Sequence, residues 1–76
     1  MYLYIFSTTI QTEADQQNLH RFLKNSTLIC RWTLDQNDPE CVLRLFTRQE
    51  QTLEVLQILG KTPFMYNYLD SVYIHP

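Results

Sequence analysis

The apolar and polar positions of this chain follow a pattern of four strands and two helices. The strands are expected where aromatic and β-branched residues cluster or alternate with polar ones, over residues 2–10, 27–35, 41–46 and 64–74. The helices are expected where apolar residues recur every three or four positions, over residues 13–24 and 48–59. The predicted order is therefore strand–helix–strand–strand–helix–strand.

The first strand is apolar on both of its faces. Leu3 and Ile5 lie on one face, and Tyr2, Tyr4 and Phe6 lie on the other. A strand that is apolar on both sides is typical of the centre of a sheet. We therefore expect this strand to have a neighbour on each edge.

The second strand alternates more clearly between apolar and polar residues. The apolar positions are Leu28, Cys30, Trp32 and Leu34. Such alternation predicts a half-buried strand. Cys30 is accordingly expected in the core or at an interface.

Each predicted helix follows a threonine that has an acidic residue three positions later. The two segments are Thr12-Glu13-Ala14-Asp15 and Thr47-Arg48-Gln49-Glu50. In such a capping box the threonine oxygen accepts from one free N–H group of the helix start, and the acid accepts from another. The sequence therefore predicts that Thr12 and Thr47 cap the two helices.

This order of elements is that of the ferredoxin-like fold, an α+β sandwich with a four-stranded antiparallel sheet and both helices on one face. Right-handed connections place the first and third strands in the centre and the other two at the edges. The 76 residues, with one glycine and three prolines, fit a single domain over residues 1–76. Asn25 and Gly60, which tolerate a left-handed backbone, are expected just after the two helices.

Charge and hydropathy exclude several classes of partner. Six basic and eight acidic residues give a net charge of −2, and both kinds are dispersed. A nucleic-acid-binding protein usually carries a basic stripe or patch, so no nucleic acid is expected. The longest apolar run is far shorter than the ~20 residues that cross a bilayer, and no cationic leader precedes it. We expect a soluble, cytoplasmic protein with reduced cysteines and no membrane partner.

Two segments carry a resemblance to a known family. They are Arg31-Trp32-Thr33-Leu34-Asp35 and Cys41-Val42-Leu43-Arg44-Leu45, joined by an acidic turn. With the fold and the length, they resemble the heavy-metal-associated domains, which are small copper-chaperone-like proteins. Within that family they are similar to a short bacterial subgroup typical of Bacteroidetes. The resemblance extends to about Leu69.

The resemblance implies a metal site, Met-x-Cys-x-x-Cys, in the loop after the first strand. When Leu19 and Leu23 are aligned with the family's helix, Ile10, Thr12 and Asp15 take the positions of the methionine and the two cysteines. A hydroxyl and a carboxylate do not replace thiolates for a soft metal. The resemblance therefore implies a domain without the family's metal-binding cysteines, and we predict no cofactor.

Other residues with metal or catalytic chemistry are isolated along the chain. Cys30 and Cys41 form an alternative metal or redox pair, although strand cysteines are commonly small buried hydrophobic residues. His20 and His75 have no partner nearby in the sequence and are expected to be solvated. Ser7, Thr8 and Thr9 have no histidine or lysine near them in the sequence to activate a hydroxyl, so we do not expect an enzyme.

The C-terminal strand is more apolar than an edge strand usually is, and such an edge invites another strand. The interface candidates are Trp32, on the strand expected at the other edge, and Tyr66, Tyr68, Val72, Tyr73 and Ile74. Tyrosine and tryptophan are favoured at interfaces because one end of each is apolar and the other is polar. The alternative is a final strand that only completes the core.

The sequence therefore favours a non-catalytic interaction or regulatory domain, which forms a homo-oligomer or binds another protein through a sheet edge or the open sheet face. One alternative is a metal-trafficking protein with a non-standard site. The other is a small-ligand sensor, in which Tyr2, Tyr4 and Phe6 line the open sheet face. Fold analogy alone supports the sensor.

Overall fold

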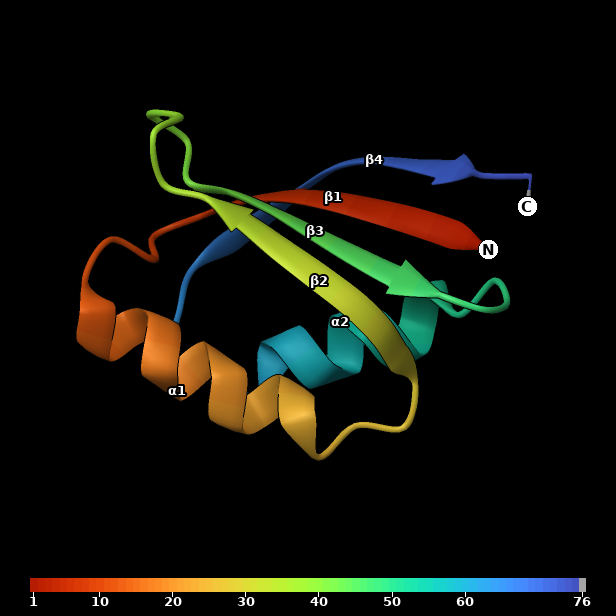
Figure 1. The fold of residues 1–76 in the computed structure, drawn as a ribbon, viewed down its shortest axis with the longest axis horizontal. Coiled ribbons are helices and arrows are strands. Elements are labelled where there is room, and N and C mark those ends of the chain that lie inside the picture. Colours follow the sequence, from red (N-terminus) through yellow and green to blue (C-terminus); the bar gives the residue numbers. More distant parts are fainter. Residues whose placement is uncertain (76) are drawn as a thin grey trace.

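The computed structural model describes residues 1–75 and shows two helices packed on one face of a four-stranded antiparallel sheet (Figure 1). The elements are β1 (Tyr2–Thr8), α1 (Glu13–Lys24), β2 (Ile29–Asp35), β3 (Val42–Thr47), α2 (Thr52–Gly60) and β4 (Tyr66–Tyr73). The strand order is β2-β3-β1-β4. The predicted α+β ferredoxin-like fold, with β1 and β3 in the centre of the sheet, is confirmed.

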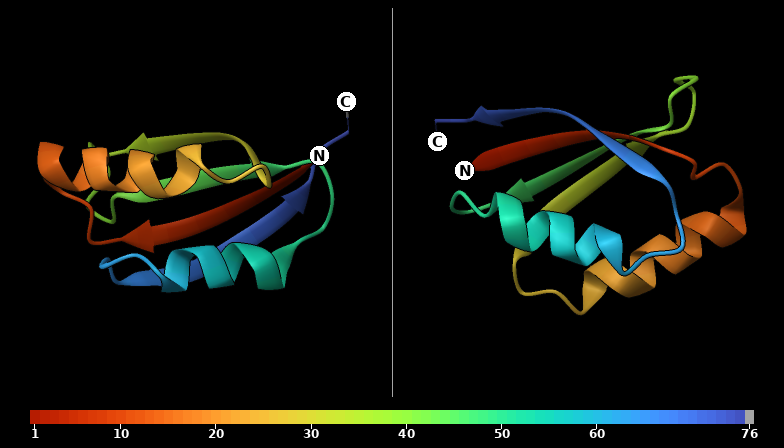
Figure 2. Two further views of the ribbon diagram at one scale, coloured as in Figure 1. Left: turned by 90° about the horizontal axis from the view of Figure 1, so that it is seen from below. Right: turned by 180° about the vertical axis from the view of Figure 1, so that it is seen from behind.

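The core lies between the sheet and the two helices. It consists of side chains from β1, β3, both helices and the loop after β1, namely Tyr4, Phe6, Ile10, Leu19, Leu23, Leu43, Leu45, Val55 and Leu59. Figure 2 shows from two further sides that α1 and α2 cover the same face of the sheet. The opposite face is left without a covering element in the part of the chain described.

The predicted capping box of α1 is confirmed. The Thr12 hydroxyl oxygen accepts a 3.1 Å hydrogen bond from the Asp15 N–H, and the Asp15 carboxylate accepts a 3.3 Å bond from the Thr12 N–H. The same carboxylate accepts from the Gln11 N–H at 3.3 Å. These backbone donors, first Gln11 and then Thr12, hold the pKa of Asp15 below its usual range.

The predicted capping box of α2 is wrong. Helix α2 begins only at Thr52, whereas Thr47 ends β3 and donates its buried hydroxyl to a carbonyl of the following loop. The residue before the helix, Gln51, has no side-chain cap, and its backbone N–H donates to the Tyr4 hydroxyl at 2.7 Å. The Glu50 carboxylate accepts from the Thr52 hydroxyl and the Thr52 N–H, which lowers its pKa.

The helix ends also differ from the expectation. Asn25 and Lys61 are the C-terminal caps, and both have right-handed backbones, with φ of −88° and −87°. Gly60 is the last residue of α2 rather than the residue after it. Within residues 1–75 the non-glycine residue with a positive φ is Cys41, at 48°, directly before β3.

A bulge in β2 reverses the expected orientation of its first residues. The register with β3 shifts between Ile29 and Arg31, which leaves Cys30 as an extra residue. Ile29 then pairs with the buried Thr47 and packs against the core, while Cys30 is exposed. The prediction that Cys30 shares the buried side of Trp32 is wrong, because one inserted residue inverts the alternation.

A second bulge lies in β4, which is one continuous strand. Ile5 pairs with Asp70 and Phe6 pairs with Tyr68, so Leu69 is the extra residue. The bulge brings Asp70 to the side of the sheet that carries Ile5. It leaves Tyr68 on the side of Phe6, toward the helices.

Candidate interaction surface

The positions that the family resemblance assigns to metal ligands form the start of α1. Ile10 is buried in the core, and Thr12 and Asp15 bond to each other's backbone. Among residues 1–75, no three side chains of His, Cys, Asp or Glu lie close enough together to hold a metal ion. The Thr12 hydroxyl and the Asp15 carboxylate thus cap the start of α1.

The structure does not bring Cys30 and Cys41 together. Cys30 lies beside the end of β3 at Thr47, whereas Cys41 directly precedes the start of β3. Six residues of extended chain separate these two points, which corresponds to about 20 Å. A disulfide requires Cα atoms within roughly 7 Å. The two thiols of one chain therefore cannot form a disulfide or share one ion.

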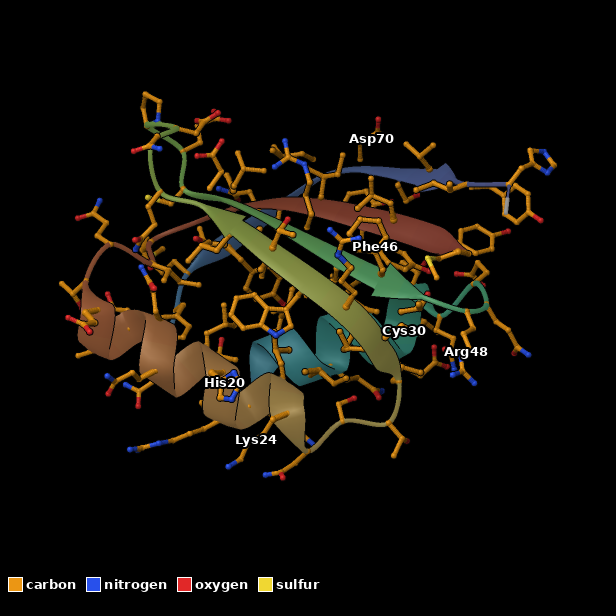
Figure 3. The ribbon with its side chains drawn as sticks, viewed as in Figure 1. His20, Lys24, Cys30, Phe46, Arg48 and Asp70 are labelled. Atoms are coloured by element: carbon orange, nitrogen blue, oxygen red, sulfur yellow. The ribbon has the colours of Figure 1, made fainter. Side chains whose placement is uncertain are left out.

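The two histidines lie apart, on α1 and after β4, and both are exposed. His20 lies on α1 (Figure 3), and its ring is 6.3 Å from the ring of Trp32. Trp32 is half-buried and pairs with the buried Leu45, so it lies on the helix side of β2. The His75 ring lies 4.8 Å from the ring of Tyr73. Trp32, an interface candidate from the sequence, thus packs beside α1 rather than on the open side of the sheet.

The aromatic residues of β4 do not form one continuous surface. Tyr66 lies edge-on to Phe6, with ring centroids 5.8 Å apart, and its hydroxyl donates to the Leu56 carbonyl at 3.4 Å. Tyr66 therefore completes the core. Tyr68 and Tyr73 lie on the same side of the sheet but remain about half exposed at its edge.

The last two candidates occupy other positions. Val72 pairs with Leu3 and points away from the helices, and it is exposed. Ile74 follows β4, and its N–H donates to the Met1 carbonyl at 2.8 Å. Of the candidates within β4, Val72 belongs to the uncovered side of the sheet.

That uncovered side carries two rows of residues, each running across all four strands. The strand registers give the first row as Arg31, Phe46, Leu3 and Val72, and the second as Thr33, Arg44, Ile5 and Asp70. We call these eight residues the open face. In Figure 3 the labelled side chain of Asp70 projects from the sheet away from the helices.

The open face has an apolar centre. Leu3 and Ile5 on β1 and Phe46 on β3 lie side by side on the two central strands, and Val72 extends the patch onto β4. The three central side chains are only partly buried. Both central strands are hydrogen-bonded to a neighbour on each edge, so the patch stands on a rigid support.

The charges of the open face are divided between its two halves. Arg31 and Arg44 lie on β2 and β3, and the Arg31 guanidinium stands over the Phe46 ring at 5.5 Å from its centroid. Asp70 lies on β4, at the opposite edge. Asp35, the last residue of β2, pairs with Val42 on the same side of the sheet, beyond the two rows, and it accepts an N–H from the adjoining turn at 3.1 Å.

The expectation that Tyr2, Tyr4 and Phe6 line this side of the sheet is wrong. Tyr4 and Phe6 are completely buried against the helices. The alternate residues of β1, Leu3 and Ile5, face outward instead. The alternation was predicted correctly, but both sets are apolar, so residue type does not reveal which set the helices cover.

No family model matches this chain. No curated protein and no solved structure matches it either. No helix within residues 1–75 combines the length and the apolar character needed to cross a membrane. The fold and the surface therefore define the class, a ferredoxin-like α+β domain with one uncovered sheet face.

Proposed function

We propose that this chain is a non-catalytic protein-interaction domain and that the open face is its contact surface. The observation that carries this proposal is the apolar patch of Leu3, Ile5 and Phe46, which lies on the central strands with no element of the described chain above it. Exposed apolar patches rimmed by polar residues are typical of sites that bind another protein.

The composition of the open face supports binding rather than catalysis. The Arg31 guanidinium lies over the Phe46 ring, and arginine is one of the residue types enriched among the residues that dominate the binding energy of interfaces. A surface built on paired strands loses little conformational entropy when it binds. Its hydroxyl, on Thr33, and its carboxylate, on Asp70, lie on the two edge strands, about 14 Å apart, which is too far for a nucleophile and its base.

We also propose that the chain is a relative of the heavy-metal-associated domains in which a helix cap has replaced the metal ligands. The support is the sequence resemblance, together with the hydrogen bonds of Thr12 and Asp15 at the start of α1. In such a relative the fold is kept and the surface, rather than a metal, carries the function.

Photo-cross-linking in the native host cells tests the contact surface. A photoreactive phenylalanine analogue is placed at Phe46 in one variant and, as a matched control, at Leu53, which is 72% exposed on α2. A specific covalent adduct from position 46 but not from position 53 is the expected result. Adducts only from position 53, or from neither position, would contradict the proposal.

A further inference from the structure

We infer that the partner at the open face is a second copy of this chain, packed sheet against sheet about a two-fold axis that runs parallel to the strands between β1 and β3. This inference rests on the proposed function of the open face. Its basis is the distribution of charge, because such an axis places the half with Arg31 and Arg44 over the half of the partner that carries Asp70.

The axis pairs each residue of a row with another residue of the same row in the partner. It places β1 over the partner's β3 and β4 over the partner's β2. Leu3 then faces the partner's Phe46, and Ile5 faces the partner's Arg44. Face-to-face sheets commonly pack with their strands within about 30° of each other and about 10 Å apart, which this arrangement allows.

The charges favour this axis over the other two-fold axis that stacks the same faces. With the axis parallel to the strands, Asp70 lies over the partner's Thr33, next to the two arginines of that half. With the axis across the strands, each strand would lie over its own copy, so the half with Arg31 and Arg44 would lie over the same half of the partner, and Asp70 would lie over the partner's β4. Like charges on opposed halves repel each other at an interface, so the parallel axis is favoured.

The size of the face sets the expected affinity. Four strands spaced about 4.8 Å apart, each rising about 3.3 Å per residue over roughly seven residues, give about 450 Å² per copy. Two such faces total about 900 Å², which is below the standard interface size of about 1,600 Å². We therefore expect a reversible dimer with a micromolar dissociation constant rather than a permanent one.

Pairing through the edge of β4 is the competing arrangement. The bulge at Leu69 interrupts the regular spacing of that edge, and bulges are one of the devices by which edge strands avoid further pairing. In the open face, by contrast, the residues of both rows are paired from strand to strand without a gap. The geometry thus favours contact through the face.

Sedimentation equilibrium of purified variants tests the inference. Asp70→Arg and Arg44→Glu are each expected to weaken the dimer about tenfold, because each turns two attractive contacts into two repulsive ones. The double variant is expected to dimerise within about twofold of wild type. An equimolar mixture of the two single variants is expected to form a heterodimer tighter than either homodimer.

Lys61→Glu is the matched control, because it makes the same charge change as Arg44→Glu at an exposed position outside the open face. Circular dichroism shows whether each variant is folded. If the single charge reversals leave the dissociation constant of the dimer unchanged, or if the double variant does not restore it, the inferred axis is wrong. A wild-type chain that is monomeric at about 1 mM overturns the second copy as partner. A monomeric chain could still give a cross-link from position 46 to a different protein. In that case the proposed function would hold and only the inference of a second copy would fail.

Discussion

The hydroxyl oxygen of Tyr4, in the middle of β1, accepts a 2.7 Å hydrogen bond from the backbone N–H of Gln51, 47 residues later in the chain. Gln51 directly precedes α2, whose first free N–H groups need acceptors. A fully buried tyrosine in turn needs a partner for its hydroxyl. One hydrogen bond meets both needs and fixes the start of α2 to the centre of the sheet.

Tyr4→Phe is expected to lower the free energy of unfolding by about 1–2 kcal/mol, because the Gln51 N–H loses its acceptor in a partly buried position. Urea denaturation at pH 7 measures the loss. Tyr73→Phe, at a half-exposed position, is the control and is expected to change stability by less than about 0.5 kcal/mol. Equal losses in the two variants would contradict the capping role of Tyr4.

Thr12→Ala is expected to cost about 1 kcal/mol of stability, because it removes the acceptor for the Asp15 N–H at the start of α1. Thermal or urea unfolding gives the difference. Thr27→Ala, at an exposed threonine in the loop before β2, serves as the control. If both substitutions cost the same, the capping box does not stabilise the helix.

The pH dependence of stability follows from Asp15. Its pKa is lower in the folded chain than its unfolded value of about 4, so its charged form stabilises the fold above that pH. This contribution is lost as the pH falls through the folded pKa. Asp15→Asn is therefore expected to destabilise the chain at pH 7, and the difference from wild type is expected to shrink below about pH 4. A difference that is unchanged at low pH would refute the assignment.

The two thiols are expected to react at different rates. Cys30 is exposed on the bulge of β2, and Cys41 is buried. A thiol reagent is expected to modify one cysteine per folded chain, and Cys30→Ser to abolish this fast reaction. Mild oxidation is expected to give chains linked through Cys30. A compact monomer with a Cys30–Cys41 disulfide would contradict the separation of the two residues along β3.

The sequence was sufficient for the parts of the fold that depend on neighbouring residues. The capping box of α1 is a signal within four residues, and the strand order follows from the element order and the handedness of the connections. The cap of α2 could not be predicted, because its acceptor is Tyr4, far away in the chain. The orientation of Cys30 also depended on a distant residue, since only the pairing of Ile29 with Thr47 reveals the bulge.

The candidate surface was predicted less well than the fold. The sequence indicated that an uncovered sheet face is a site of association, and Val72 belongs to that face. It did not single out Arg44 and Asp70, which become neighbours of Ile5 only through the registers of β1 with β3 and β4. The alternation along β3 was the available signal, because Arg44 and Phe46 share the side opposite to two buried leucines.

The central claim is that this chain associates with a second copy of itself through its uncovered sheet face, and its amide NMR spectrum tests that claim most directly. Spectra are recorded from about 10 μM to 1 mM, a range that spans a micromolar dissociation constant. Concentration-dependent shifts are expected at Leu3, Ile5 and Phe46 and not on the outer sides of α1 and α2. Shifts confined to the helices, or spectra identical across the whole range, would contradict the claim.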